Sequence, residues 1–220
     1  MMMHDGPWVM ILACGFSMLI FIAELWRKLG SPSAEATRKV VHIGSGFGCG
    51  MMPFVLNSAW SVFFLALVFV SVFAITRQMG LLPSLHGVQR KTQGSLYYPI
   101  AVLIVFILSS HTPAIYLASI LVLALADGAA AMIGTHYGVH RYRCGPGVRS
   151  VEGSVAFCVV SYLAISTTLL LLTEIAPSHV CAVSLGVALV LTMVESMSFY
   201  GTDNLSVPVG ASLLLGYFLP

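Results

Sequence analysis

The residues with the clearest chemical potential lie in the stretch 121–154, where an apolar helix runs into a basic loop. Asp127 stands in the apolar part. A carboxylate there costs about 2.5–3.5 kcal/mol in membrane hydrocarbon, so such acids are usually kept for function. Arg141, Arg143 and Arg149 follow in the loop, which ends on the segment 150–154, Ser-Val-Glu-Gly-Ser. Acids, hydroxyls and arginines in this order indicate phosphate and metal chemistry.

Small residues follow Asp127 at roughly helical spacing, at Ala130, Gly134 and Gly138. One interpretation is a packing face, on which the acid pairs with a neighbouring helix. The other is that the small side chains let a phosphate approach the backbone, while Asp127 binds a divalent cation or takes a proton. Packing explains the glycines but leaves the acid unexplained.

The segment that begins at Arg149 also has two interpretations. Ser150 or Ser154 would cap the helix that follows, and Glu152 would favour its dipole. Capping leaves Arg149 unexplained. Free N–H groups at a helix N-terminus beside an arginine form a natural anion site, which suits a nucleotide phosphate.

A second cluster of polar residues opens an earlier apolar run. Arg38 and Lys39 are either topology signals and lipid-headgroup contacts or phosphate ligands, and the pair Arg90 and Lys91 has the same two interpretations. His42 lies one turn deeper than Arg38. It is either a polar side chain satisfied by its neighbours or part of the site.

Near the C-terminus, Glu195 lies about two turns inside an apolar helix, and such acids are functional candidates by default. The turn 201–204, which contains Asp203 and Asn204, has the composition that any tight connection prefers. These acids join the list of candidates.

Composition excludes a soluble domain. Of the 220 residues, 58% are hydrophobic and 8% are charged, against about 25% charged in soluble domains. The mean hydropathy is +0.95, and repeated apolar runs approach the roughly 20 residues that cross a bilayer. The net charge of +2 is too small to argue for nucleic acid. The five cysteines show no disulfide or zinc spacing. We expect an all-α, polytopic helical membrane protein with a single domain over residues 1–220.

The apolar runs predict about eight membrane-spanning helices, over residues 8–26, 40–56, 59–76, 96–108, 114–133, 153–172, 177–200 and 205–219. All ten Lys and Arg residues fall in the connections after the first, third and fifth spans. With eight spans these connections and the turn 201–204 share one face. The positive-inside rule makes that face cytoplasmic and puts both termini outside.

From Arg38 to Pro208 the chain resembles the CTP-dependent polyprenol kinase family, which includes dolichol kinase, phytol and farnesol kinase, and CTP-dependent diacylglycerol kinase. Arg149 stands where lysine is usual, and it keeps the charge as a planar fork. Eight spans match the shorter phytol-kinase-like and prokaryotic members better than the dolichol kinases. The resemblance rests on the order and spacing of Arg38, Lys39, His42, Gly94, Tyr98, Pro99, Asp127, Ala130, Gly134, Gly138, Ser150, Glu152, Gly153, Ser154, Glu195, Asp203, Asn204, Leu205 and Pro208.

The resemblance implies transfer of the terminal phosphoryl group of CTP to a membrane-embedded isoprenoid alcohol or to diacylglycerol, with Mg²⁺ as cofactor. Such transfer needs positioning and charge stabilisation. His42 or Asp127 would accept the alcohol proton, and the site would face the cytoplasm, in the plasma membrane of a prokaryote. The expected catalytic residues are Asp127, His42 and Glu152. The expected metal ligands are Asp127, Glu152 and Asp203. The expected nucleotide contacts are Arg38, Lys39, Gly134, Gly138, Arg149, Ser150, Gly153, Ser154 and Asn204.

Two other functions fit parts of the pattern. A cytidylyltransferase related to CDP-diacylglycerol synthase would also use CTP but would release pyrophosphate. A transporter would use Asp127 and Glu195 to carry protons or cations. The paired aspartates of the first class and the inverted repeats of the second are not seen in the sequence.

Overall fold

The computed structural model describes residues 2–87, 92–144 and 147–219, so Arg90 and Lys91 lie outside the described part. Most of that part is helical. In chain order the elements are α1 (Met2–Gly30), α2 (Ala34–Gly50), α3 (Met52–Val55), α4 (Ala59–Gln78), α5 (Pro83–His86), α6 (Gly94–Ser109), α7 (Pro113–Leu121), η1 (Val122–Ala126), α8 (Asp127–His136), β1 (Arg141–Cys144), β2 (Gly147–Ser150), α9 (Val151–Leu172), α10 (Pro177–Met197) and α11 (Asp203–Phe218).

Five helical segments within the described residues are long and apolar enough to cross a membrane: Asp5–Gly30, Ala59–Gln78, Pro113–His136, Val151–Leu172 and Pro177–Met197. The other three predicted spans correspond to α2, α6 and α11, which have 17, 16 and 16 residues. At 1.5 Å per residue these helices are about 24–26 Å long, short of a hydrocarbon core of about 30 Å. For those three helices a membrane crossing stays a prediction.

The structure is nearly all-α, as expected, and one connection departs from the helical pattern. The basic loop forms an antiparallel hairpin, in which Arg141 pairs with Ser150 and Tyr142 pairs with Arg149. Residues directly opposite each other in a hairpin point to the same side. Tyr142 and Arg149 therefore face the same neighbour, and both contact α10 or the chain just beyond it.

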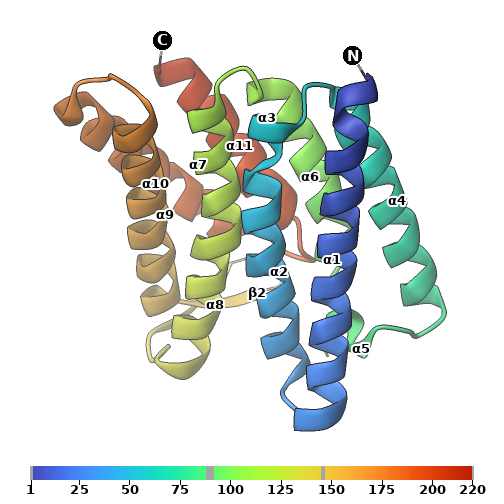
Figure 1. The fold of residues 1–220 in the computed structure, drawn as a ribbon. Helices are drawn as coiled ribbons and strands as arrows, with labels where there is room; N and C mark the ends of the chain where they lie inside the picture. The colour runs from blue at the N-terminus through green and yellow to red at the C-terminus, as the bar shows by residue number, and fades with distance from the viewer. Residues whose placement is uncertain (1, 88–91, 145–146, 220) are drawn as a thin grey trace.

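The long helices run up and down in one bundle, with both termini at one end and with α5 and the hairpin at the other (Figure 1). This arrangement agrees with an even number of helical segments and with the grouping of the basic connections on one face. The face that meets the cytoplasm stays a prediction.

The segments α7, η1 and α8 form one continuous rod inside the bundle, packed against α2 and α9. Gly46 of α2 makes the closest approach to this rod, because a Cβ at that position would lie 2.3 Å from the Cβ of Ala124. Only glycine fits at such a distance. The close packing brings the polar start of α2 beside the end of η1.

Candidate active site

Asp127 is the first residue of α8 and is 8% exposed. The ammonium group of Lys39 forms an ion pair with its Oδ2 and also donates to its backbone carbonyl over 3.2 Å. His42 places Nε2 3.5 Å from the same Oδ2. A buried carboxylate needs such partners, because an unpaired buried charge is strongly destabilising.

The orientation of the His42 ring follows from its contacts. Its Nε2 lies 2.9 Å from the carbonyl oxygen of Leu123. A carbonyl oxygen only accepts, so Nε2 carries the proton and Nδ1 keeps the lone pair in the neutral ring. Tyr98 meets the ring edge to face at 4.9 Å between centroids, and its hydroxyl donates to the His42 carbonyl over 3.3 Å. Leu123 belongs to η1, a π-helical turn, and such turns are frequent at functional sites.

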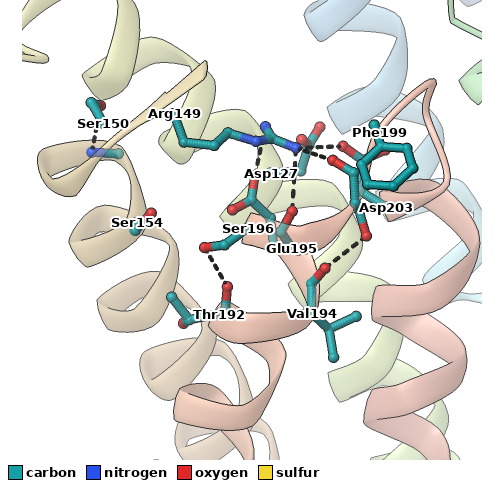
Figure 2. A network of polar contacts seen from close by, with 12 residues as sticks. Asp127, Arg149, Ser150, Ser154, Thr192, Val194, Glu195, Ser196, Phe199 and Asp203 are labelled. Atoms are coloured by element: carbon teal, nitrogen blue, oxygen red, sulfur yellow. Dashed lines mark hydrogen bonds and ion pairs between the residues drawn. The ribbon is translucent and has the colours of Figure 1, made fainter. Parts of the chain in front are cut away.

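Arg149 joins the hairpin to α10 and α11. Its Nη1 lies 2.8 Å from Glu195 Oε1, and its Nη2 donates to the Ser198 carbonyl over 2.8 Å and lies 3.7 Å from Asp203 Oδ2. Figure 2 shows the guanidinium reaching across to Glu195 and Asp203, with Asp127 beside it. Glu195 is only 3% exposed. Arg149 therefore compensates a buried acid and holds the hairpin in place.

The small residues near Asp127 allow α8 to pack closely on the start of α9. A Cβ on Gly153 would lie 3.0 Å from the Ala130 carbonyl oxygen, and a Cβ on Gly138 would lie 2.2 Å from the Gly134 carbonyl oxygen. Ser150 caps α9, since its Oγ accepts from the Gly153 N–H over 3.1 Å. The packing and capping interpretations are therefore correct for these residues, and they leave a phosphate role open.

Glu152 and Ser154 hold the hairpin. Both the ring Nδ1 and the backbone N–H of His140 donate to Glu152 Oε1, over 2.7 and 3.1 Å. The Tyr142 hydroxyl lies 2.6 Å from Ser154 Oγ and 2.8 Å from Ser196 Oγ. These contacts account for Glu152 and Ser154 without a ligand.

A polar cavity of about 460 Å³ lies beside Asp127, between α8, the hairpin, the start of α9 and α10. It brings together side chains from distant parts of the sequence, including both signs of charge. Its lining is Glu35, Asp127, Ala130, Ala131, Gly134, Thr135, Arg141, Val148, Arg149, Ser150, Gly153, Ser154 and Glu195.

A second cavity, also of about 460 Å³, lies between α1, α2, α4 and α6 and is mostly apolar. Its polar residues gather near α5 and the start of α2, and they include Arg38, His42, Arg77 and Asn204. The rest of its wall is aliphatic and aromatic. We call the two spaces the polar cavity and the apolar cavity.

The two cavities divide the residues that the sequence singles out. Asp127, Gly134, Arg149, Ser150, Gly153 and Ser154 line the polar cavity. Arg38, His42 and Asn204, which were expected to act together with them, line the apolar cavity. Lys39, Gly138, Glu152 and Asp203 line neither: Lys39 is paired with Asp127, and Asp203 lies beside Arg149. The roles expected for all these residues stay predictions.

Magnesium in kinases is usually held by one or two carboxylates together with substrate phosphates. No group of three or more His, Cys, Asp or Glu side chains in the described part of the chain could hold a metal ion by itself. Asp127 and Glu195 do line the polar cavity, whereas Glu152 binds His140. This donor set fits an ion held mainly by nucleotide phosphates, with Asp127 as the protein ligand.

Three charged residues of the polar cavity were missing from the expected site: Glu35, Arg141 and Glu195. Glu195 was signalled by its position in an apolar helix, and Arg141 by its place in the basic loop. Nothing in the sequence marked Glu35 as a site residue, because an acid in the first turn of a helix is common. Tyr98 lies against His42 and was noted only through the family resemblance.

Comparison with known proteins places this geometry in a family. No model of a known protein family matches the sequence, and no solved structure matches it. A phytol kinase of Synechocystis sp. is 31% identical over 198 residues, which cover 89% of this chain and 84% of the relative. Since this identity extends over most of both chains, the chain belongs to the family of polyprenol and phytol kinases.

Proposed function

We propose that this kinase transfers the terminal phosphoryl group of CTP to the hydroxyl of a membrane-embedded prenyl alcohol. One observation carries the proposal: His42, which lines the apolar cavity, places Nε2 3.5 Å from Oδ2 of Asp127, which lines the polar cavity. A lipid kinase must bring a water-soluble donor and a lipid acceptor together at one point. The paired cavities offer that arrangement.

The polar cavity suits the nucleotide. Its volume falls in the range of about 300–1,000 Å³ that is typical of ligand sites. The N-terminus of α9 opens into it at Ser150 and Gly153, and a helix N-terminus favours phosphate. Arg149 is occupied by Glu195, whereas the Arg141 side chain forms no hydrogen bond or ion pair with the described residues and is available for phosphate. The choice of CTP rests on the family resemblance.

His42 is the better base of the two candidates. The carboxylate of Asp127 is engaged by Lys39, whereas Nδ1 of His42 keeps a lone pair that can accept a proton. The alcohol oxygen forms a bond to the γ-phosphorus, the bond from that phosphorus to the β,γ-bridging oxygen breaks, CDP leaves, and His42 takes the hydroxyl proton. A magnesium ion bound with the nucleotide would neutralise phosphate charge, with Asp127 as its carboxylate ligand.

The apolar cavity suits the acceptor, because its polar end lies at His42 and its walls are hydrocarbon-like. A prenyl alcohol or diacylglycerol would present its hydroxyl there from within the bilayer. By the positive-inside rule the nucleotide then enters from the cytoplasm. The assignment to a prokaryotic plasma membrane rests on the family resemblance.

The test uses the purified full-length protein in lipid nanodiscs. It is offered phytol, farnesol, dolichol or diacylglycerol with γ-labelled CTP or ATP, with and without Mg²⁺. We expect labelled prenyl phosphate and free CDP, in a reaction that stops when Mg²⁺ is chelated. Release of pyrophosphate would instead identify a cytidylyltransferase, and absence of any lipid product with every donor would refute the proposal.

A further inference from the structure

The apolar cavity has a closed end, and this end faces away from the reacting groups. Near α3 its lining consists of buried side chains, with Met52 2% exposed, Val62 1% and Val102 3%. Tyr116 fixes this end, because its hydroxyl donates to the Cys49 carbonyl over 3.0 Å and contacts Met52 Sδ at 3.7 Å. The end is part of the packed core and leaves no path onward for a chain.

α1 and α4 together form one wall of the cavity. Phe16 of α1 and Phe69 of α4 meet edge to face with their ring centroids 5.7 Å apart. Both line the cavity, together with Leu19 and Phe73. An occupant in the cavity therefore meets side chains at its far end and along this wall.

The depth of the cavity is limited. Along α4 the lining runs from Arg77 to Val62, which corresponds to about 22 Å at 1.5 Å per residue. From His42 to Met52 the same rise gives about 15 Å, roughly half of a hydrocarbon core of about 30 Å. A hydroxyl held at His42 thus leaves space for a short isoprenoid tail. A polyprenol tail several times longer cannot be enclosed.

We infer that the closed end formed by Cys49, Met52 and Val62 sets an upper limit on the length of the prenyl chain that this kinase accepts. The inference rests on the proposed function, because it takes His42 as the position of the hydroxyl. A farnesyl tail fits within this depth, and the longer phytyl tail must bend to fit. An undecaprenyl tail is too long for the cavity, so part of it stays outside. The tail is then not fully buried, and its burial no longer holds the hydroxyl in position.

Opposite substitutions at Val62 test this limit. Val62→Phe shortens the cavity and Val62→Ala lengthens it, so the ratio of kcat/KM for farnesol to that for phytol should rise in the first variant and fall in the second. Small changes in an apolar pocket shift specificity by about tenfold or more. Loss of stability alone cannot move the ratio in both directions. Val68→Phe is the matched control, because Val68 lies on the same helix and is 55% exposed.

The inference is overturned if Val62→Phe and Val68→Phe give the same ratio, or if the wild-type protein phosphorylates undecaprenol as well as phytol. Unfolding temperatures measured with each alcohol and without nucleotide report on the cavity alone, since a bound ligand stabilises the folded state. Stabilisation that depends on chain length, without phosphoryl transfer, would refute the kinase proposal and keep the length limit. Phosphoryl transfer that does not depend on chain length would support the kinase proposal and refute the length limit.

Discussion

The polar and the apolar cavity have the same volume, about 460 Å³, but differ in the number of charged side chains that line them. The polar cavity carries two arginines and three acids, contributed by α2, α8, the hairpin and α10. The apolar cavity is walled by aliphatic and aromatic side chains and has arginines only near one end. Size therefore does not distinguish them. The chemistry of the walls assigns one to a charged ligand and the other to a hydrocarbon chain.

We expect the residues that lie between the two cavities to matter most for the reaction. His42 and Asp127 come from different helices and touch different cavities, and they are held together by Lys39, Leu123 and Tyr98. Changes in one cavity should alter the handling of one substrate, whereas changes at the junction should alter the reaction of both.

The largest effect is expected at Asp127. Asp127→Asn removes the carboxylate that would bind the metal ion and should lower kcat by about 10²–10³-fold, because that ion would neutralise phosphate charge in the transition state. Steady-state phosphorylation of phytol or farnesol measures it. An Asp127→Asn enzyme with normal kcat would contradict the assignment.

Asp5→Asn is the matched control. Asp5 is also a buried carboxylate, 1% exposed, but it lies at the opposite end of the bundle and accepts hydrogen bonds from the Ser58 N–H over 3.0 Å and the Ser61 hydroxyl over 2.8 Å. This substitution should lower the unfolding temperature and leave kcat unchanged.

A slightly smaller loss is expected for His42→Gln. The glutamine amide can still donate to the Leu123 carbonyl, but it cannot accept the alcohol proton. We expect kcat to fall by about 10²-fold, because general-base catalysis contributes about 10²–10⁴. The wild-type rate should fall toward acid pH as a base becomes protonated, and the variant should lose this dependence. An unchanged pH–rate profile would show that another group takes the proton.

A substitution at Arg149 should affect the binding of the nucleotide and leave the binding of the alcohol unchanged. Arg149→Lys keeps a charge but loses the forked contacts to Glu195 and Ser198, which hold the hairpin that carries Arg141. KM for the nucleotide should therefore rise about tenfold while KM for the alcohol stays constant. Arg149→Ala should also lower stability by about 3–5 kcal/mol, because Glu195 is left buried without a partner. The double variant with Glu195→Gln should recover the stability but not the nucleotide KM.

The smallest effect is expected for Glu152→Gln. Glu152 binds an exposed His140 and lines neither cavity, and exposed ion pairs contribute little. We expect a change in kcat of about twofold or less and faster proteolysis of the hairpin. A loss as large as that of Asp127→Asn would instead support the catalytic and metal-binding role expected from the family resemblance.

The sequence predicted the positions of the helices better than it predicted their lengths or the hairpin between α8 and α9. All eight apolar runs correspond to helical segments, because uninterrupted apolar stretches signal helices directly. The hairpin was not predicted. Its strands are four residues each, and Tyr142 and Arg149 are stabilised by contacts to α9, α10 and the chain just beyond α10 that are distant in the sequence.

The sequence predicted which residues belong to the candidate site, but it did not predict which of them pair with one another. An acid in an apolar helix marked Asp127 and Glu195, yet nothing in the sequence paired the first with Lys39 and the second with Arg149. Glu152 appeared equivalent to these acids. Its different role follows from its position on the outer side of α9, beside His140.

From the sequence alone we could predict a helical membrane protein. The sequence also indicated the residues that could carry out phosphate chemistry and the family that the chain resembles. Those properties depend on composition, local spacing and the cost of charges in hydrocarbon. The folded structure was needed to show that the candidates divide between two cavities and that His42 Nε2 lies 3.5 Å from Asp127 Oδ2. That division depends on contacts across the bundle, such as the close approach at Gly46, where two backbones pack at a distance that only the folded arrangement of both helices defines.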